Sequence, residues 1–384
     1  MTQLLDGVTV LDLSSVGPAS RAAGWLADYG AAVVKVAPIA TGTQITPPLH
    51  AYSGGRGTRR IRLDLKSDAG RETFLRLAEH ADVVLESFRP GVVARLGIGY
   101  DDVKSRNPRI VYCSTSGYGQ DGERAQWAGH DLNYLAVGGY LAHTEPAQHD
   151  KPPLPGATVA DSAAGGMQAV IAILAALVGR DRTGDGGYLD VAVADGVLAL
   201  MALQIDDHLA TGATPSPGSA PLGGRLACYD TYPTSDGRWI SVAAIETKFW
   251  ANLCRALGLD DCIDQQYDAA AQAGIRARLT DAFASRSRDE WTAALAGADT
   301  CVAPVLSPAE AAHDPHTRAR AAVATARTAT GAKIAQLAPL LAGAQRRPAY
   351  DLPDPESTDT RRLLGDCGFT SEEIDALLTS GAVQ

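Results

Sequence analysis

The chain has 384 residues, 46% of them hydrophobic and 20% charged, and carries a formal net charge of −10. This is the composition of a folded globular protein with room for two domains, which excludes a disordered or fibrous chain. The acidic balance argues against a nucleic-acid partner, because binding to a phosphate backbone needs a positive surface. Since no uncharged apolar run reaches the roughly 18–20 residues of a membrane span, we expect no membrane contact and a cytoplasmic location.

The first 120 residues alternate between predicted strands and helices. A β-branched run at 8–13, a helical pattern through Tyr29 and a second run at 32–36 form one βαβ unit. Further elements are a helix at 69–81 and strands at 82–86 and 110–113. This alternation predicts a parallel sheet covered by helices. The first turn lacks G-x-G-x-x-G, so we assign no nicotinamide cofactor.

A basic segment, Tyr52–Lys66, is predicted to be a flexible loop. It carries five cations beside glycines, among them Arg56, Arg59 and Arg60. Arg89 follows the next predicted strand, at the strand end where open α/β sheets bind ligands. In an acidic protein such a group suits a phosphate-bearing ligand. The alternative is a solvated loop whose arginines pair with nearby carboxylates.

The stretch from Trp127 to Gly166 contains residues able to move protons. It opens with Gly129-His130-Asp131 and ends at Asp161, just before a long apolar run. Asp161 stands where a helix N-cap would stand, so its carboxylate and the free N–H groups of the next turn would point at one small volume. That volume suits an anionic intermediate. We interpret His130 and Asp161 as an acid/base pair.

The second half of the chain predicts a smaller α+β domain. Residues 211–224 are rich in Gly, Pro, Ser and Thr, as is typical of a linker. A β-hairpin is predicted over 228–244, and Glu246 stands just past it at the start of a helix. From 309 to 340 the chain is rich in alanine and offers few anchors.

The six cysteines are scattered along the chain, and neither they nor the histidines show the spacing of a zinc site. We therefore expect free thiols and no metal. Each acid/base candidate also has an ordinary structural explanation. A lone histidine such as His130 is often structural, Asp161 suits a helix cap, and Glu246 suits the positive end of a helix dipole.

Several short segments stand in a fixed order along most of the chain: Asp12 to Val36, Leu63–Ser67, Phe88–Gly91, Gly129–Tyr134, Ala160-Asp161 and Tyr229 to Glu246. With this set the chain resembles the alpha-methylacyl-CoA racemases and, more broadly, the class III CoA-transferase superfamily that contains them. The resemblance implies an interlocked homodimer, each chain having a Rossmann-like large α/β domain and a smaller α+β central domain.

On this sequence the implied fold divides as follows: residues 1–210 in the large domain, 211–224 as linker, 225–320 in the small domain, and 321–384 as return linker and C-terminal part of the large domain. The resemblance also implies that the catalytic cleft lies between the large domain of one subunit and the small domain of the other. Glu246 would then meet His130 across chains.

In racemases of this family the histidine matching His130 pairs with the glutamate matching Glu246, and the aspartate matching Asp161 works on the opposite face of the substrate. The resemblance therefore implies 1,1-proton transfer at the α-carbon of a 2-methylacyl-CoA, with no cofactor beyond the CoA of the substrate. In the transferases the aspartate matching Asp161 is instead a nucleophile that forms an acyl anhydride and then an aspartyl-CoA thioester. A non-catalytic acyl-CoA carrier is a third hypothesis.

Two features bear on these hypotheses. Formyl-CoA-type transferases carry a glutamine in the first glycine turn, whereas the turn Ser15–Ala19 has none, which favours the racemase. Many relatives place an arginine after the second strand to meet the CoA nucleotide, but this chain reads Ala37-Pro38-Ile39. We therefore assign the CoA phosphates to the arginines named above: Arg56, Arg59, Arg60 and Arg89.

Overall fold

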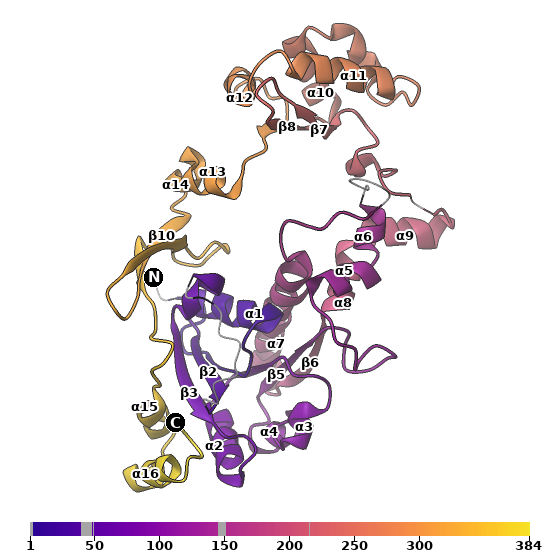
Figure 1. Ribbon diagram of the computed structural model, residues 1–384. Helices are drawn as coiled ribbons and strands as arrows, with labels where there is room; N and C mark the ends of the chain where they lie inside the picture. The colour runs from indigo at the N-terminus through magenta and orange to yellow at the C-terminus, as the bar shows by residue number, and fades with distance from the viewer. Residues whose placement is uncertain (1–2, 40–47, 49, 145–150, 215) are drawn as a thin grey trace. The chain divides into compact units, whose positions relative to one another are not determined.

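The computed structural model describes residues 3–39, 48, 50–144, 151–214 and 216–384. The chain divides into two compact units (Figure 1). The first comprises Met1–Gly138, Pro155–Met201 and Pro315–Gln384, and the second comprises Gly139–Leu154 and Ala202–Asp314. These boundaries separate compact units of the chain. The domain boundaries expected at residues 210, 224 and 320 stay predictions.

A six-stranded sheet forms the centre of the first unit, in the order β3-β2-β1-β4-β5-β6. Every neighbouring pair is parallel. The strands are β1 (Thr9–Asp12), β2 (Ala32–Pro38), β3 (Thr58–Leu63), β4 (Val83–Glu86), β5 (Val111–Ser116) and β6 (Gly187–Ala192). The strand order reverses between β1 and β4, which is the Rossmann-like arrangement. The predicted α/β fold class is confirmed.

Helices cover both faces of this sheet because its strands alternate apolar side chains between two cores. One core holds Val10, Val33 and Val83 against α1 (Gly17–Asp28) and α7 (Gln168–Thr183). The other core packs the opposite sheet face against these helices: α2 (Asp68–Glu79), α4 (Tyr100–Arg106), α15 (Thr360–Asp366) and α16 (Ser371–Thr379). Three short helices lie in connections of the unit: α3 (Val92–Arg95), α5 (Asp131–Val137) and α8 (Val193–Leu200).

The prediction of a flexible loop over Tyr52–Lys66 is wrong. Its first part is a 3₁₀ helix, η1 (Ala51–Gly55), and its second part is the edge strand β3. Ile61 and Leu63 in β3 are fully buried, at 0% and 1% exposure, while Arg59, Arg60 and Arg62 of the same strand are only half-buried. The alternation of basic and apolar residues is therefore that of a strand with one face in the core.

The C-terminal segment Pro315–Gln384 returns to the first unit and completes it. Val383 forms an antiparallel bridge with Leu63 at the edge of the sheet. A second sheet, missed by sequence reasoning in the alanine-rich segment, consists of β10 (Val323–Arg327), β11 (Lys333–Leu337) and β12 (Ala349–Asp351). The short helix α14 (Pro315–Ala319) leads into it.

A single helical stretch, Ala160–Thr183, begins as the π-helix η2 (Ala160–Met167) and continues as α7. Among the residues described, it is the one helix long and apolar enough, by length and composition, to cross a membrane. One of its faces lies in the sheet core through Ala169, Val170 and Ile173, as in a core helix of a globular domain. Its other face leaves Ile171 67% exposed.

The second unit contains the expected β-hairpin, β7 (Tyr229–Pro233) and β8 (Trp239–Ala243), which is confirmed as an antiparallel pair. The strand β9 (Val302–Pro304) pairs with β8. The core of this sheet is closed by α10 (Thr247–Leu257), η4 (Asp260–Gln265), α11 (Gln272–Phe283) and α12 (Arg288–Leu295). The remaining helices of the unit are α6 (Tyr140–His143), α9 (Ala202–Thr211), η3 (Pro221–Gly223) and α13 (Pro308–His313).

Candidate active site

His130 stands immediately before α5, in extended backbone conformation, and its side chain is exposed. Its N–H donates to Asn133 Oδ1 at 3.0 Å, which fixes the start of the helix. The preceding Gly129 is enclosed by tyrosines: a Cβ built there would lie 2.8 Å from the hydroxyl of Tyr118 and 2.8 Å from the ring of Tyr134. The glycine of the Gly-His-Asp motif therefore lets the chain pass these rings and present the histidine.

A hydrogen bond between Asp131 and Asp161 connects the starts of the helices α5 and η2. The N–H of Asp161 donates to Asp131 Oδ1 at 2.8 Å, although the two residues are thirty positions apart. This contact brings the Gly-His-Asp motif and the aspartate predicted from the sequence into one site within the first unit.

The expectation that Asp161 is the N-cap of its helix is wrong. The helix begins at Ala160, so Asp161 lies in its first turn, with Val159 as the capping position. The expected free N–H donors are also used: Asp161 donates to Asp131, and Ser162 donates to the carbonyl of Thr158 at 3.0 Å. The carboxylate of Asp131, rather than that of Asp161, satisfies the start of this helix.

The side chain of Asp161 is half-buried. Burial raises the pKa of its carboxyl above the ordinary value, and the charge of Asp131 raises it further. Arg21 and His130 oppose this change in pKa through their positive charge. Arg21 reaches the site from α1 and donates to Thr158 Oγ1 at 2.6 Å. Asp161 is thus a carboxyl whose pKa burial and Asp131 raise and whose neighbours Arg21 and His130 act in the opposite direction.

Small residues let the helix of Asp161 pack closely on its neighbours. A Cβ at Gly166 would lie 2.8 Å from the ring of Trp25 in α1, and one at Gly196 in α8 would lie 2.0 Å from the carbonyl oxygen of Ala164. Both approaches exclude a larger side chain. Close packing against α1 on one side and α8 on the other therefore fixes the position of the helix that carries Asp161.

Glu246 belongs to the second unit, where it is the exposed residue that precedes α10. Gln266, which is buried, holds the turn before it by donating through Nε2 to the carbonyls of Ala244 at 3.0 Å and Ile245 at 2.6 Å. Tyr267 also donates its hydroxyl to the carbonyl of Ile245. Three hydrogen bonds therefore fix the residues that lead into Glu246.

The predicted CoA-binding arginines occupy different environments. Arg56 is 6% exposed and binds both carboxylate oxygens of Asp28, at 2.7 and 2.9 Å, and the carbonyl of Leu337 at 2.6 Å. Arg59 lies 3.8 Å from Asp366, and Arg60 donates to the carbonyl of Pro355.

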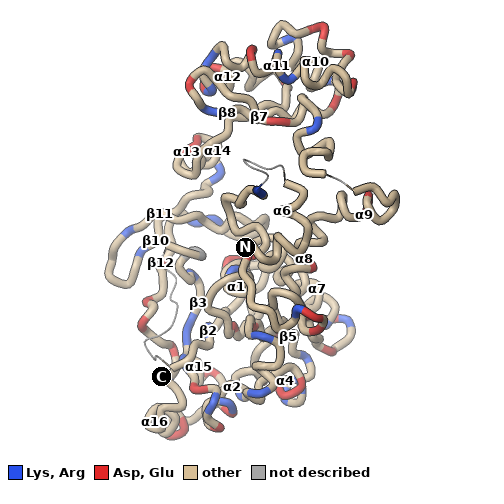
Figure 2. The backbone as a smooth tube through the Cα atoms, turned by 45° about the vertical axis from the view of Figure 1, so that its right-hand side comes forward, with Lys and Arg blue, Asp and Glu red and all other residues tan. Residues whose placement is uncertain are grey.

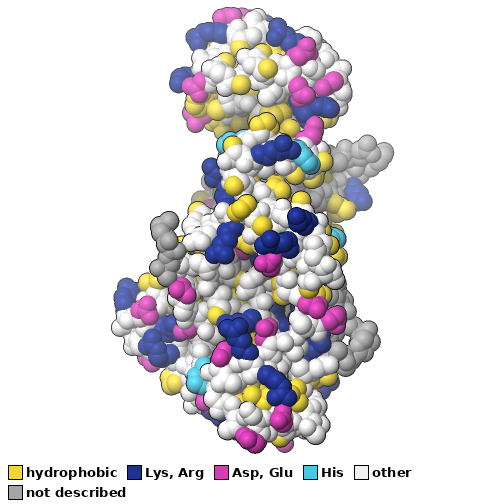
Figure 3. Space-filling model, turned by 90° about the vertical axis from the view of Figure 1, so that its left-hand side faces the viewer, with side chains coloured by type: hydrophobic (Ala, Val, Ile, Leu, Met, Phe, Trp, Pro, Cys, Tyr) yellow, Lys and Arg dark blue, Asp and Glu magenta, His cyan; other side chains and the backbone are white. Residues whose placement is uncertain are grey.

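The contacts of Arg59 and Arg60 tie β3 to the C-terminal segment of the chain, and basic residues lie along the strand in Figure 2. On the face drawn in Figure 3, basic and acidic side chains of the first unit are interspersed. Arg89, in contrast, is exposed in the turn after β4.

Glu86 is a buried carboxyl that sequence reasoning missed. It ends β4 at 2% exposure, and it accepts hydrogen bonds from the Phe88 N–H at 2.7 Å and from the Ser114 hydroxyl. Burial raises its pKa from an ordinary value of 4.5 to about 7. The available signal was an acidic residue closing an apolar strand just before Ser-Phe-Arg-Pro-Gly. Arg21 gave no comparable signal, because its helix reads as an ordinary amphipathic one.

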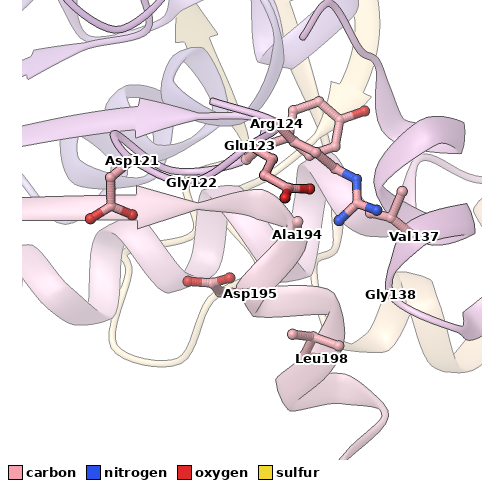
Figure 4. A pocket seen from close by; sticks show the side chains of 10 residues that line it. Asp121, Gly122, Glu123, Arg124, Val137, Gly138, Ala194, Asp195 and Leu198 are labelled. Carbon is pink, nitrogen blue, oxygen red and sulfur yellow. The ribbon is translucent and has the colours of Figure 1, made fainter. Parts of the chain in front are cut away.

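A hollow of about 200 Å³ lies beside α5 and α8 (Figure 4). It is lined by Tyr118, Asp121, Gly122, Glu123, Arg124, Val137, Gly138, Ala194, Asp195 and Leu198. Three carboxylates against one guanidinium make it unsuited to phosphate. His130 and Asp161 are not among its lining residues.

Within the described ranges, no group of three or more His, Cys, Asp and Glu side chains is placed to hold a metal ion. The six cysteines are free thiols, as predicted. The groups that His130, Asp161 and Arg21 offer at the site are an imidazole, a carboxyl and a guanidinium.

Comparisons of the sequence and of the structure with known proteins point to the same family. The sequence model described as CoA-transferase family III matches residues 5–360. Human alpha-methylacyl-CoA racemase is 34% identical over 375 residues, which cover 96% of this chain and 95% of the racemase. Acetyl-CoA:oxalate CoA-transferase from Acetobacter aceti is 32% identical over 334 residues, which cover 82% of this chain and 84% of the transferase. A solved CaiB/BaiF family protein from Brucella suis matches with a TM-score of 0.77 at 28% identity, covering 96% of this chain and 100% of its own.

Proposed function

The chain belongs to CoA-transferase family III, and from this premise we propose that it is an acyl-CoA racemase acting at the α-carbon of a 2-methylacyl-CoA thioester. The observation that carries the proposal is the hydrogen bond from the Asp161 N–H to Asp131, which joins Asp161 to the motif of His130. The likeness to the human racemase over nearly the whole chain supports the same reaction.

The proposed reaction uses His130 and Asp161 as opposed acid/base groups. One of them removes the α-proton, and the electron pair of the C–H bond moves onto the thioester oxygen as an enolate. The other returns a proton to the opposite face of the α-carbon. The raised pKa of Asp161 favours this role, because a carboxyl with greater proton affinity is the stronger base and remains available as an acid.

The binding part of the proposal assigns the CoA phosphates to Arg56, Arg59, Arg60 and Arg89, with no further cofactor. The exposed position of Arg89 at the carboxyl end of the sheet supports its assignment most strongly. The contacts of Arg56 with Asp28 and Leu337 support a structural role for that residue in addition.

The proposal includes a homodimer in which Glu246 of one subunit pairs with His130 of the other. Exposed apolar side chains on α7 and α8 support association, among them Ile171 at 67% and Val178 at 63% exposure. We also expect a cytoplasmic protein without nucleic-acid or membrane partners.

A CoA-transferase is the second candidate, favoured by the likeness to acetyl-CoA:oxalate CoA-transferase. In that reaction a carboxylate oxygen of Asp161 attacks the thioester carbonyl, the C–S bond breaks, and CoA leaves as the thiolate. The thiolate then attacks the aspartyl carbonyl of the anhydride and releases the first carboxylate. The half-buried Asp161 carboxyl supports this role as well, since water competes less at such a site.

Chiral analysis of the product tests the proposal. We expect the wild type to convert one epimer of a 2-methylacyl-CoA into the other, and His130→Asn and Asp161→Asn each to lower the rate roughly 10²–10⁴-fold. His80→Asn, at an exposed histidine that ends α2, is the matched control and should be unchanged.

The second candidate gives a different result in the same samples. A hydroxylamine-sensitive adduct at Asp161, formed with an acyl-CoA and a free carboxylate but without epimerisation, would establish the transferase instead. CoA binding that is indifferent to His130→Asn, with neither activity, would indicate a carrier.

A further inference from the structure

We propose that Glu86 is a positioning residue that fixes the turn Ser87–Gly91 and thereby aims Arg89 at the phosphates of CoA. The inference rests on the proposed function, in which Arg89 binds CoA, and it adds a residue that touches neither the substrate nor the reacting atoms.

The contacts of Glu86 lie at the base of this turn. Its Oε2 accepts the Phe88 N–H at 2.7 Å, one residue before Arg89, and its Oε1 accepts the Ser114 hydroxyl from the neighbouring strand β5. Glu86 and Ser114 are register partners in the sheet. A carboxyl at 2% exposure is costly to bury, so these two donors are what hold it in place.

The far side of the turn is held independently. Gln126 Nε2 donates to the carbonyl of Pro90 at 3.2 Å, and the Val92 N–H donates to the carbonyl of Arg89 at 3.1 Å. Gly91 has a φ of +82°, which favours glycine and turns the chain into α3. The backbone of Arg89 is thus fixed on both sides while its side chain is exposed.

Glu86 also belongs to a polar row across three strands. Ser114 is in register with Asp190 of β6, and Asp190 Oδ2 accepts the Gln120 N–H at 2.9 Å. Glu86 therefore holds the segment with Arg89, and Asp190 holds the segment that leads to Gln126 and His130. Both segments are therefore anchored to adjacent strands of the same sheet.

The surroundings of Glu86 favour its protonated form, because burial raises its pKa. Asp190 is the charged group that adds to burial in raising the pKa of Glu86, while Ser114 and the Phe88 N–H oppose the increase. Tyr112 and Tyr188 share the same environment: burial raises the pKa of both hydroxyls, and nearby carboxylates, Glu86 among them, add to the increase. Glutamine keeps an oxygen for the Phe88 N–H without the charge, so Glu86→Gln should keep the turn in place and Glu86→Ala should release it.

Calorimetric titration of the full-length protein with CoA tests the inference. We expect Glu86→Ala to weaken binding roughly 10-fold, because the Phe88 N–H loses its acceptor and the turn no longer holds Arg89 in place; this loss corresponds to about 1.4 kcal/mol. Glu86→Gln should stay within about 2-fold of the wild type. In the double variant Glu86→Ala/Arg89→Ala, the loss should equal that of Arg89→Ala alone, because Glu86 acts through Arg89.

Hydrogen exchange at the Phe88 amide gives a readout that does not depend on CoA. Faster exchange in Glu86→Ala, with protection restored in Glu86→Gln, is the expected result. Unchanged Phe88 protection, or losses in CoA affinity that add in the double variant, would overturn the inference. A wild type that binds no CoA would instead overturn the proposed function, while the exchange data still report on the turn.

Discussion

The backbone N–H of Asp161 donates to the carboxylate of Asp131 at 2.8 Å. A single hydrogen bond thus connects the acidic residue after the histidine motif to the helix that carries the second acid/base candidate. The same carboxylate raises the pKa of the Asp161 carboxyl by its charge. Asp131 therefore acts on Asp161 in two ways, and the two effects are separable by substitution.

Asparagine at position 131 keeps an oxygen that can accept the Asp161 N–H but removes the negative charge. The pKa of Asp161 should then fall, because a carboxylate without a like charge beside it ionises more readily. The ionised form persists to lower pH, so the acidic limb of the rate profile should move to lower pH in Asp131→Asn.

The pH dependence of kcat/KM for epimerisation measures this change. Asp195→Asn, at an exposed aspartate on α8, is the matched control and should leave the profile in place. An acidic limb that is unmoved in Asp131→Asn, or moved to higher pH, would contradict the assigned role of the Asp131 charge.

Glu86 should make the stability of the first unit depend on pH. Because its pKa rises from 4.5 unfolded to about 7 folded, the folded state binds an extra proton between these values. Its stabilising contribution is complete below the unfolded pKa and is lost as the pH rises through 7. Relative to Glu86→Gln, the wild type should lose about 2–3 kcal/mol of unfolding free energy between pH 5 and pH 8.

Urea unfolding at pH 5 and pH 8 checks this prediction. At each pH, the unfolding free energy of wild type and of Glu86→Gln is obtained by linear extrapolation to zero urea. If the difference between wild type and Glu86→Gln is the same at pH 5 and pH 8, the raised pKa is wrong.

Substitution of Arg56 should lower the stability of the fold, whereas substitution of Arg89 should lower the affinity for CoA. Removing Arg56 leaves Asp28 buried without its partner, so Arg56→Ala should cost about 3–5 kcal/mol of unfolding free energy. Arg89 is exposed, so Arg89→Ala should change stability by less than about 0.5 kcal/mol.

Affinity for CoA should fall roughly 10-fold in Arg89→Ala, through loss of a charged phosphate contact. Arg182→Ala, at an exposed arginine near the end of α7, serves as control for loss of one surface charge. Equal losses of affinity in Arg89→Ala and Arg182→Ala would remove Arg89 from the binding site.

Mixed dimers test the proposed pairing of Glu246 with His130 of the other subunit. His130→Asn and Glu246→Gln should each be inactive alone. Coexpressed, they should regain roughly a quarter of wild-type activity, since half of randomly assembled dimers are mixed and each mixed dimer has one intact site of two. Restoration by coexpression cannot arise if both residues act within one chain, so its absence in isolated mixed dimers would contradict the pairing.

The sheet was predictable because its strands are β-branched runs bounded by turns, as at 8–13 and 82–86. The edge strand β3 was not, because its arginines resemble a solvated loop and only Ile61 and Leu63 show the buried alternation. The strands β10 and β11 were also missed. Alanine favours helices, and the pairing of β10 with its neighbours β11 and β12 outweighs that preference.

At the candidate site, the sequence proposed His130 and Asp161 through their motifs, but it did not predict the contact between their segments. That contact depends on Asp131 reaching a backbone N–H thirty residues away, which no local pattern encodes. The expected N-cap at Asp161 was wrong because the helix starts two residues earlier than that expectation requires, at Ala160 with Val159 as the capping residue. Glu86 escaped notice because a carboxyl at a strand end is usually solvated, and burial is a property of the whole sheet.

Deuterium incorporation at the α-carbon distinguishes racemisation from CoA transfer. The enzyme is incubated in heavy water with a single epimer of 2-methylacyl-CoA, across several chain lengths, and the acyl group is analysed by mass spectrometry. We expect one deuterium at the α-carbon with wild type and none above background with His130→Asn or Asp161→Asn. Absence of exchange with every chain length, while CoA passes to an added carboxylate, would contradict the racemase and leave the transferase.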